Sequence, residues 1–339
     1  MHEGTTAAPQ VRRGMGVMSR IPAPRTETLS RLAIALLVAN IVIVVTGGAV
    51  RLTGSGLGCP EWPRCTESSF VVHGALGIHG LIEFGNRMLT FVLAAVAIAT
   101  WVATLRYSPR RPALRRLATA LMVGIPAQAL LGGLTVLSGL NPWVVALHLL
   151  LSLALVGVAV ALVRRIQEGD QPARPTVPSP VVALTRATFV TAWAVLYVGT
   201  VVTGSGPHAG DAASPRTGLS PATVSQLHAD LVFLLVGLTV GCLVALRATH
   251  APRRAQRAAA WLLAIELAQG AIGFTQYFTD LPIVLVGLHV LGAALVSAAA
   301  TWLLLGVRDR GDPPTQRSGV PARSDDLRLP AAGGLRPGR

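Results

Sequence analysis

Long apolar runs alternate with short polar segments along most of the chain. Each run holds about twenty residues, enough for a helix rising 1.5 Å per residue to cross a hydrocarbon core of roughly 30 Å. We expect such helices near residues 32–50, 77–105, 117–137, 143–163, 184–202, 223–246, 258–277 and 283–305. The pattern therefore predicts an all-α polytopic membrane protein with eight transmembrane helices.

A polar, proline-rich segment in the middle of the chain divides the apolar runs into two sets of four. The two ends of the chain show no apolar periodicity and have a composition typical of disorder. The predicted organisation is a disordered tail at 1–30, a four-helix half at 31–165, a linker at 166–181, a second four-helix half at 182–307 and a disordered tail at 308–339.

The two halves repeat short motifs in the same order. TGSG occurs at residues 53–56 and again at residues 203–206. HGLIEF in the first half corresponds to HADLVF in the second, and ALHLLLS corresponds to GLHVLGA. Since each half has an even number of helices, the repeat is parallel, with its axis along the membrane normal. We therefore expect two tandem four-helix bundles related by pseudo-two-fold symmetry.

Composition and charge support a membrane protein and give its orientation. Only 13% of the residues are charged, against about 25% in soluble domains. The net charge is +14, and every Lys or Arg is an arginine. The arginines gather in the tails and alternate loops, which by the positive-inside rule puts both termini in the cytoplasm and the cysteine-containing loop after the first helix outside. Because these charges follow topology and face anionic lipid, nothing supports a nucleic-acid partner, and no secretory signal peptide is evident. The predicted location is the plasma membrane.

Four histidines lie near the outer ends of the even-numbered helices: His79, His148, His228 and His289. The last three follow a proline by six or seven residues, which puts each imidazole roughly 10 Å into its helix if the proline starts it. We expect His79 at a similar depth. Each half thus offers two imidazoles at one level, as a haem iron with two axial histidines requires. A single intramembrane histidine can instead bond a neighbouring helix or serve in a proton relay.

Two further groups could carry chemistry. Glu83 lies four residues after His79 and four before Arg87, so its carboxylate could take a proton beside the proposed ligand or form a structural ion pair with Arg87. Cys59 and Cys65 lie in the outer loop, where a disulfide can staple the chain or exchange with thiols.

Five segments resemble the bacterial haem A synthase family: TGGAVRLTGSGLGCPEWPRC, EFGNRMLT, PWVVALHLLLSLAL, QLHADLVF and LHVLGAAL. They follow the family's order and cover roughly residues 30–306. The resemblance implies an eight-helix bundle that oxidises the C8 methyl of haem O to a formyl group through hydroxylated intermediates, with oxygen from water. The product, haem A, serves terminal oxidases. The loop cysteine pair belongs to one subgroup of the family.

The resemblance also implies site residues. His228 and His289 would bind the iron of a resident haem b, and the substrate haem would lie in the first half, where we assign His79 and His148 as axial ligands and Glu83 as the proton acceptor. Many members have Glu-x-x-His-Arg on the second helix, whereas here Asn86 stands at the histidine position. We assign His79 instead because the internal repeat pairs it with His228.

Two other functions remain open at this point: a di-haem b-type electron carrier without porphyrin chemistry, and a repeat-built transporter. The family motifs and the cysteine loop, which only the first half has, favour the enzyme. The transporter is less favoured because its sites usually lie at the midplane on broken helices. Haem O synthase is a candidate partner that would deliver haem O.

Overall fold

The structure is a computed structural model that describes residues 23–314. Eight α-helices in the described part are long and apolar enough to cross a membrane, which confirms the predicted fold class. They are α1 (Thr26–Leu52), α2 (Gly77–Arg106), α3 (Pro112–Leu137), α4 (Pro142–Ile166), α5 (Ser179–Ser205), α6 (Pro221–Ala248), α7 (Arg253–Phe278) and α8 (Ile283–Gly306). A short 3-10 helix, η2 (Gly74–Leu76), precedes α2.

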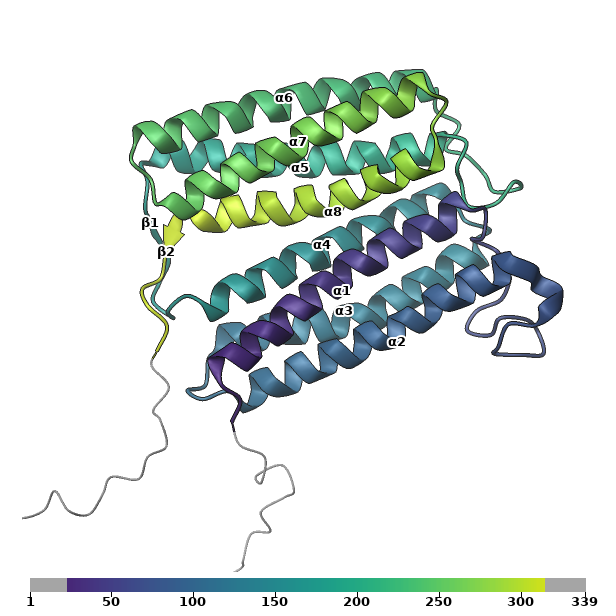
Figure 1. The fold of residues 1–339 in the computed structure, drawn as a ribbon, viewed down its shortest axis with the longest axis horizontal. Helices are drawn as coiled ribbons and strands as arrows, with labels where there is room; N and C mark the ends of the chain where they lie inside the picture. Colours follow the sequence, from purple (N-terminus) through teal and green to yellow (C-terminus); the bar gives the residue numbers. More distant parts are fainter. Residues whose placement is uncertain (1–22, 315–339) are drawn as a thin grey trace, which may run out of the picture.

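The helices form two four-helix bundles that lie side by side (Figure 1). Helices α1 to α4 pack in a ring, and α5 to α8 repeat the same neighbours in the same order. Between the bundles α4 packs on α8, α1 on α8 and α5 on α4. Exchanging α1 with α5 and α4 with α8 maps this set of contacts onto itself, which is consistent with the predicted pseudo-two-fold relation.

Small residues let the two bundles approach closely. A Cβ atom added to Gly157 of α4 would lie 3.0 Å from the Thr301 hydroxyl of α8. One turn away, the Ser297 hydroxyl donates a 2.8 Å hydrogen bond to the Leu153 carbonyl of α4. Small side chains and interhelical hydrogen bonds are how membrane helices associate without a hydrophobic driving force between them.

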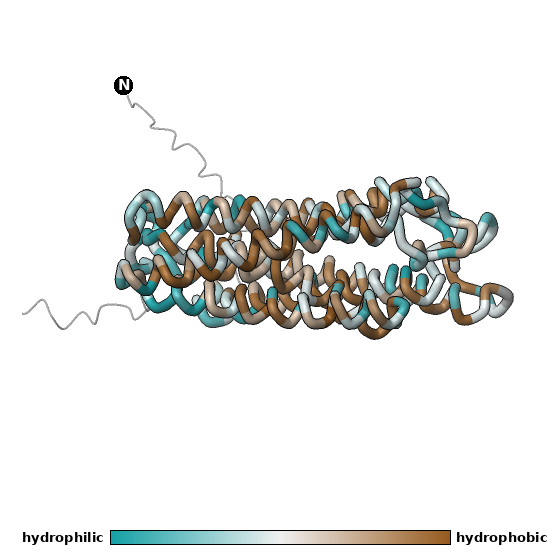
Figure 2. The backbone as a smooth tube through the Cα atoms, turned by 90° about the horizontal axis from the view of Figure 1, so that it is seen from above, coloured by the Kyte–Doolittle hydropathy of each residue, from teal (hydrophilic) through white to brown (hydrophobic). Residues whose placement is uncertain are grey.

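The outer faces of the bundles suit a lipid environment. Large apolar side chains such as Phe91, Val190 and Phe233 are more than half exposed. Hydrophobic residues dominate the helices, while hydrophilic residues gather at the two ends of the molecule (Figure 2). The protein is therefore a multi-pass membrane protein.

The two ends of the bundle differ. One end, here called the terminal end, carries the start of α1 and the end of α8; the other, here called the loop end, carries the segment between α1 and α2 (Figure 1). At the terminal end, β1 (Arg174–Pro175) of the linker pairs antiparallel with β2 (Arg308–Asp309). The Gly169 amide donates to the Gly311 carbonyl at 2.6 Å.

The structure changes the predicted boundaries of the linker and of both tails. Of the predicted linker, residue 166 belongs to α4 and residues 179–181 belong to α5. Residues 26–30 belong to α1, and residues 308–309 belong to β2, although the sequence assigned both stretches to disordered tails. The β2 pairing exists because the linker lies against the segment that leaves α8, a contact between residues far apart in sequence. Of the predicted tails, residues 1–22 and 315–339 lie outside the described residues.

Candidate functional site

The four histidines all lie toward the loop end, but not at one depth. His148 is the seventh residue of α4, His228 the eighth of α6 and His289 the seventh of α8. Each helix starts at or just after the proline that the sequence indicated. His79 is only the third residue of α2, so the expectation of a similar depth is not met. The 3-10 turn η2 delays the start of α2.

In the second bundle two imidazoles are in contact in a T-shaped, edge arrangement. The ring centroids of His228 and His289 lie 6.3 Å apart with an interplanar angle of 67°. Among the described residues no such ring contact joins His79 and His148. The two bundles therefore present their histidines differently.

Each of the three deeper histidines rests against a glycine of the neighbouring odd-numbered helix. A Cβ atom added to Gly199 of α5 would lie 3.1 Å from the His228 ring, and one added to Gly273 of α7 would lie 3.5 Å from the His289 ring. In the first bundle, a Cβ atom on Gly132 of α3 would lie 3.3 Å from the His148 ring. These glycines leave room for the imidazoles.

We missed these glycines in the sequence, although the internal repeat contains a signal for two of them. Gly132 and Gly273 each precede their histidine by sixteen residues, and Gln128 and Gln269 precede the glycines by four. The repeat therefore preserves the packing surface of the histidine as well as the histidine itself.

The turn after α1 contacts one ring nitrogen of His79. Its Nδ1 atom lies 3.0 Å from the hydroxyl of Ser55, which is fully buried and lies 2.8 Å from the Thr53 hydroxyl. The rest of the His79 side chain is exposed. A hydrogen bond on one ring nitrogen fixes the orientation of the ring and leaves the other nitrogen free for a ligand.

Glu83 and Arg87 form the predicted ion pair, with a nitrogen–oxygen distance of 2.6 Å. The other carboxylate oxygen of Glu83 accepts a 2.5 Å hydrogen bond from the Cys59 amide. Arg87 also donates to the carbonyls of Cys59, Glu61 and Arg64, each at 3.0 Å. The pair therefore fastens the loop after α1 to the loop end of α2.

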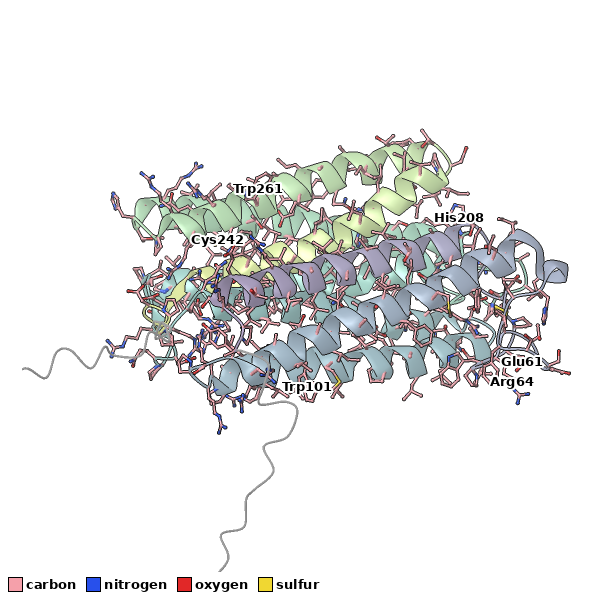
Figure 3. All side chains as sticks on the ribbon, turned by 60° about the horizontal axis from the view of Figure 1, so that its bottom comes forward. Glu61, Arg64, Trp101, His208, Cys242 and Trp261 are labelled. Atoms are coloured by element: carbon pink, nitrogen blue, oxygen red, sulfur yellow. A yellow bond between two sulfur atoms is a disulfide. The ribbon has the colours of Figure 1, made fainter. Side chains whose placement is uncertain are left out.

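That loop covers the loop end of the first bundle. Its Cys59 and Cys65 are joined by a disulfide and are fully buried. The ring of Trp62 lies directly over Gly133 of α3, where an added Cβ atom would come within 2.3 Å. The second bundle has a different loop at this end, in which the His208 ring contacts the Leu281 carbonyl at 3.0 Å. His208, Glu61 and Arg64 all lie at the loop end (Figure 3).

Three polar residues within the spans make contacts that involve none of the four histidines. The Asn86 amide oxygen accepts a 2.8 Å hydrogen bond from the Thr46 hydroxyl of α1. Glu266 is buried and accepts a 2.9 Å bond from Thr239. Cys242 is a buried free thiol that contacts Thr185.

The histidines fit a haem by two observations. The Nδ1 atoms of His148, His228 and His289 are buried without a hydrogen-bond partner, although the His228 ring also bonds the Val195 backbone. Two imidazoles that share one metal at about 2 Å each have ring centres about 6 Å apart, and the 6.3 Å between His228 and His289 agrees with that value.

Fold and site together define a polytopic membrane protein of two tandem four-helix bundles that carries histidines suited to haem. Comparison with known proteins identifies its family. A profile described as "Cytochrome oxidase assembly protein", COX15-CtaA, matches residues 30–76 and 77–218. The chain belongs to this family.

Several relatives bear the name Heme A synthase. The chain is 30% identical to that of Symbiobacterium thermophilum over 269 residues, which is 74% of this chain and 84% of the relative. It is 30% identical to that of Bacillus licheniformis over 151 residues (42% of this chain, 47% of the relative). With that of Lysinibacillus sphaericus it shares 31% over 140 residues (41% and 45%). The chain thus spans just under half the length of the last two relatives.

Proposed function

We propose that this protein is a haem A synthase, an oxidoreductase that converts the C8 methyl of haem O to a formyl group with oxygen from water. The observation that carries the proposal is the contacting pair His228 and His289, in a family whose relatives bear that name. Such a pair of imidazoles can hold a retained haem, and the names of the relatives in the family indicate the class of substrate.

The second bundle would hold the resident cofactor. His228 and His289 would be the axial ligands of a haem b, which when bound supplies one-electron redox chemistry. Gly199 and Gly273 leave space for the two rings. The protein side of this site is thus preformed, as suits a group that stays bound.

The first bundle would hold the substrate haem O, with His148 and His79 as the proposed ligands even though the two imidazoles lie at different depths. Ser55 would orient His79 so that its free nitrogen faces the iron. Glu83 would accept a proton as the methyl is oxidised, with Arg87 compensating its charge. The cysteine loop, fastened over this bundle by Arg87, would exclude bulk water from the reacting carbon.

The proposed topology puts both termini in the cytoplasm and the loop end outside, in the plasma membrane. The terminal end carries most of the arginines, which supports this orientation. Haem O synthase is the proposed source of substrate, and the bilayer is the route by which so apolar a porphyrin would arrive. The disulfide would act as a staple of the loop or exchange electrons with an outside thiol.

The chemistry is tested by haem extraction and chromatography on membranes of a host that makes no haem A. The host would express this protein with a haem O synthase. Haem A or its hydroxylated intermediate is expected. Haem b alone, with a stable low-spin spectrum, would instead indicate a di-haem electron carrier.

The ligand assignment is tested separately by the haem retained on purification. His228→Ala and His289→Ala should each lose the low-spin haem b spectrum, because one axial ligand is removed. His73→Ala is the matched control, since His73 is exposed in the loop before α2 and should leave the spectrum unchanged. Normal haem b content in both helix variants would overturn the assignment.

A further inference from the structure

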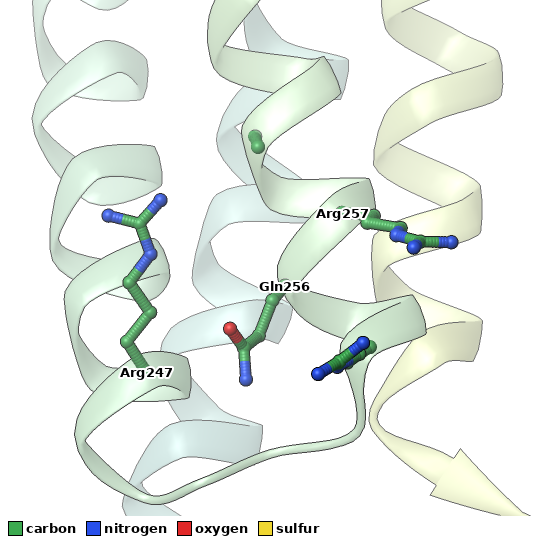
Figure 4. Close-up of a pocket in the computed structure, with 5 residues that line it drawn as sticks. Arg247, Gln256 and Arg257 are labelled. Carbon is green, nitrogen blue, oxygen red and sulfur yellow. The ribbon is translucent and has the colours of Figure 1, made fainter.

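Three arginines border a cleft where α6 ends and α7 begins, at the terminal end of the second bundle. The cleft has a volume of about 320 Å³ and is lined by Arg247, Arg253, Gln256, Arg257 and Ala260. Arg247 lies on α6, while Gln256 and Arg257 come from the first turns of α7 (Figure 4).

These arginines are not neutralised within the described part of the protein. Among residues 23–314, no carboxylate pairs with Arg247, Arg253 or Arg257, and all three are exposed. Arg254, between them, is different because it bonds Asp309 at 3.3 Å. An uncompensated cluster at one cleft produces a local positive potential that attracts an anion.

At the corresponding junction in the first bundle, two arginines are used internally, while Arg110 and Arg116 are exposed. At the α2–α3 turn, Arg111 is buried and pairs with Asp170 at 2.8 Å, and Arg115 donates to the Leu105 carbonyl at 2.6 Å. The repeat therefore places arginines at both junctions, and at the second junction the exposed arginines border a cleft.

Other groups at the cleft add to the anion affinity. Helix α7 has no acidic residue in its first turn and no side-chain cap, so its terminal amides add to the positive end of the helix dipole. The Gln256 side chain is held in place by a 2.8 Å bond to the Ala251 carbonyl. A phosphate group matches planar guanidinium donors well.

The surface next to the cleft is apolar, which distinguishes a lipid from a free phosphate. Trp261 lies one turn beyond Arg257 on α7 and is 63% exposed, and Val244 lies one turn before Arg247 on α6 and is 59% exposed. Trp261 and Trp101 both lie toward the terminal end (Figure 3), where tryptophans mark the level of lipid headgroups.

We propose that this cleft is a binding site for an anionic phospholipid, with the headgroup phosphate on Arg247, Arg253 and Arg257 and the acyl chains along Val244 and Trp261. The combination of cationic rim and apolar flank fits an amphiphile of this kind. In the proposed orientation the site faces the anionic inner leaflet.

The test is binding of phosphatidylglycerol to the purified, delipidated full-length protein, measured by native mass spectrometry. Substituting Arg247, Arg253 and Arg257 together by Gln should weaken binding at least about tenfold, because three phosphate contacts are lost. The matched control replaces three exposed arginines of the terminal end, Arg25, Arg110 and Arg116, by Gln and removes the same charge. That control should bind within about twofold of the unchanged protein.

Two results would overturn the proposal. Equal weakening in both triple variants would mean diffuse charge attraction rather than a site. Displacement of the lipid by inorganic phosphate at comparable concentration would mean a soluble-anion site. If the triple variant fails to fold, the single change Arg257→Gln is compared with Arg116→Gln, and equal affinity in that pair would also overturn the site.

Discussion

At the scale of single residues, Glu83 combines a structural contact with a position suited to chemistry. One carboxylate oxygen bonds the Cys59 amide and the other bonds Arg87, so the side chain helps to hold the loop after α1. The same contacts hold a base one turn from His79 on α2. The structural and catalytic interpretations of Glu83 are therefore compatible, and a suitable substitution can separate them.

Glu83→Gln keeps the size of the side chain and one carbonyl oxygen but removes the charge. If Glu83 accepts a proton, haem A formation should fall by about 100-fold or more. The Cys59–Cys65 disulfide should remain, because Arg87 still holds the loop through backbone carbonyls. The measurements are haem A per haem O in membranes and thiol labelling of the purified protein.

The matched control for this change is Glu67→Gln. Glu67 is exposed in the same loop, and its backbone carbonyl rather than its carboxylate accepts the bond from Arg64. Unchanged haem A formation in Glu83→Gln would rule out the proton role. Free thiols in the same variant would show that the carboxylate mainly fastens the loop.

At the scale of elements, the histidines depend on the helices behind them. Gly273 on α7 leaves the space that the His289 ring occupies on α8. Gly270, one turn earlier on the same helix, faces open space within 4 Å. The two positions therefore differ in packing while sharing the same backbone conformation.

Gly273→Val should displace the His289 ring and reduce the retained low-spin haem b. A Cβ atom at this position would already be in contact with the ring, and the two methyl groups of valine would extend beyond it and overlap the ring. Gly270→Val should retain the haem. The absorbance spectrum of the purified protein in detergent measures both. Equal haem content in the two variants would show that the glycine does not position the ligand.

The elements also show what the sequence could predict and why. Apolar runs gave all eight helices, and the prolines before His148, His228 and His289 marked true helix starts, because both signals are local. The i, i+4 spacing of Glu83 and Arg87 gave their ion pair for the same reason. Which histidines bind iron stays a prediction.

Nonlocal contacts set the features that the sequence did not predict. His79 lies shallow because the loop packs against the start of α2, where a Cβ atom on Gly58 would meet the His79 backbone at 2.3 Å. The bonds from Cys59, Glu61 and Arg64 to the Glu83–Arg87 pair use backbone atoms that have no sequence signature. The similar spacing of His79 and His228 after TGSG therefore does not give them the same position in their helices.

At the scale of the whole molecule, a buried polar cluster joins three parts of the chain at the terminal end. Arg111, at the start of α3, donates to the carbonyls of Arg165, Ile166 and Glu168 and to the carboxylate of Asp170. The linker around Gly169 then bonds the segment after α8. The cluster thus connects the first bundle, the linker and the end of the second bundle.

Arg111→Ala tests whether this cluster stabilises the whole molecule. The side chain is 1% exposed, and its removal would leave the buried carbonyls of Arg165, Ile166 and Glu168 without this donor, while Asp170 would keep its pair with Arg165. The expected loss is about 1–3 kcal/mol in the free energy of unfolding, as for buried polar groups left unsatisfied. Arg110→Ala removes an exposed neighbour of equal charge and should change stability by less than about 0.5 kcal/mol. Thermal unfolding of both variants in the same detergent compares them, and equal melting temperatures would show that the terminal end is held by the packing of the helices rather than by Arg111.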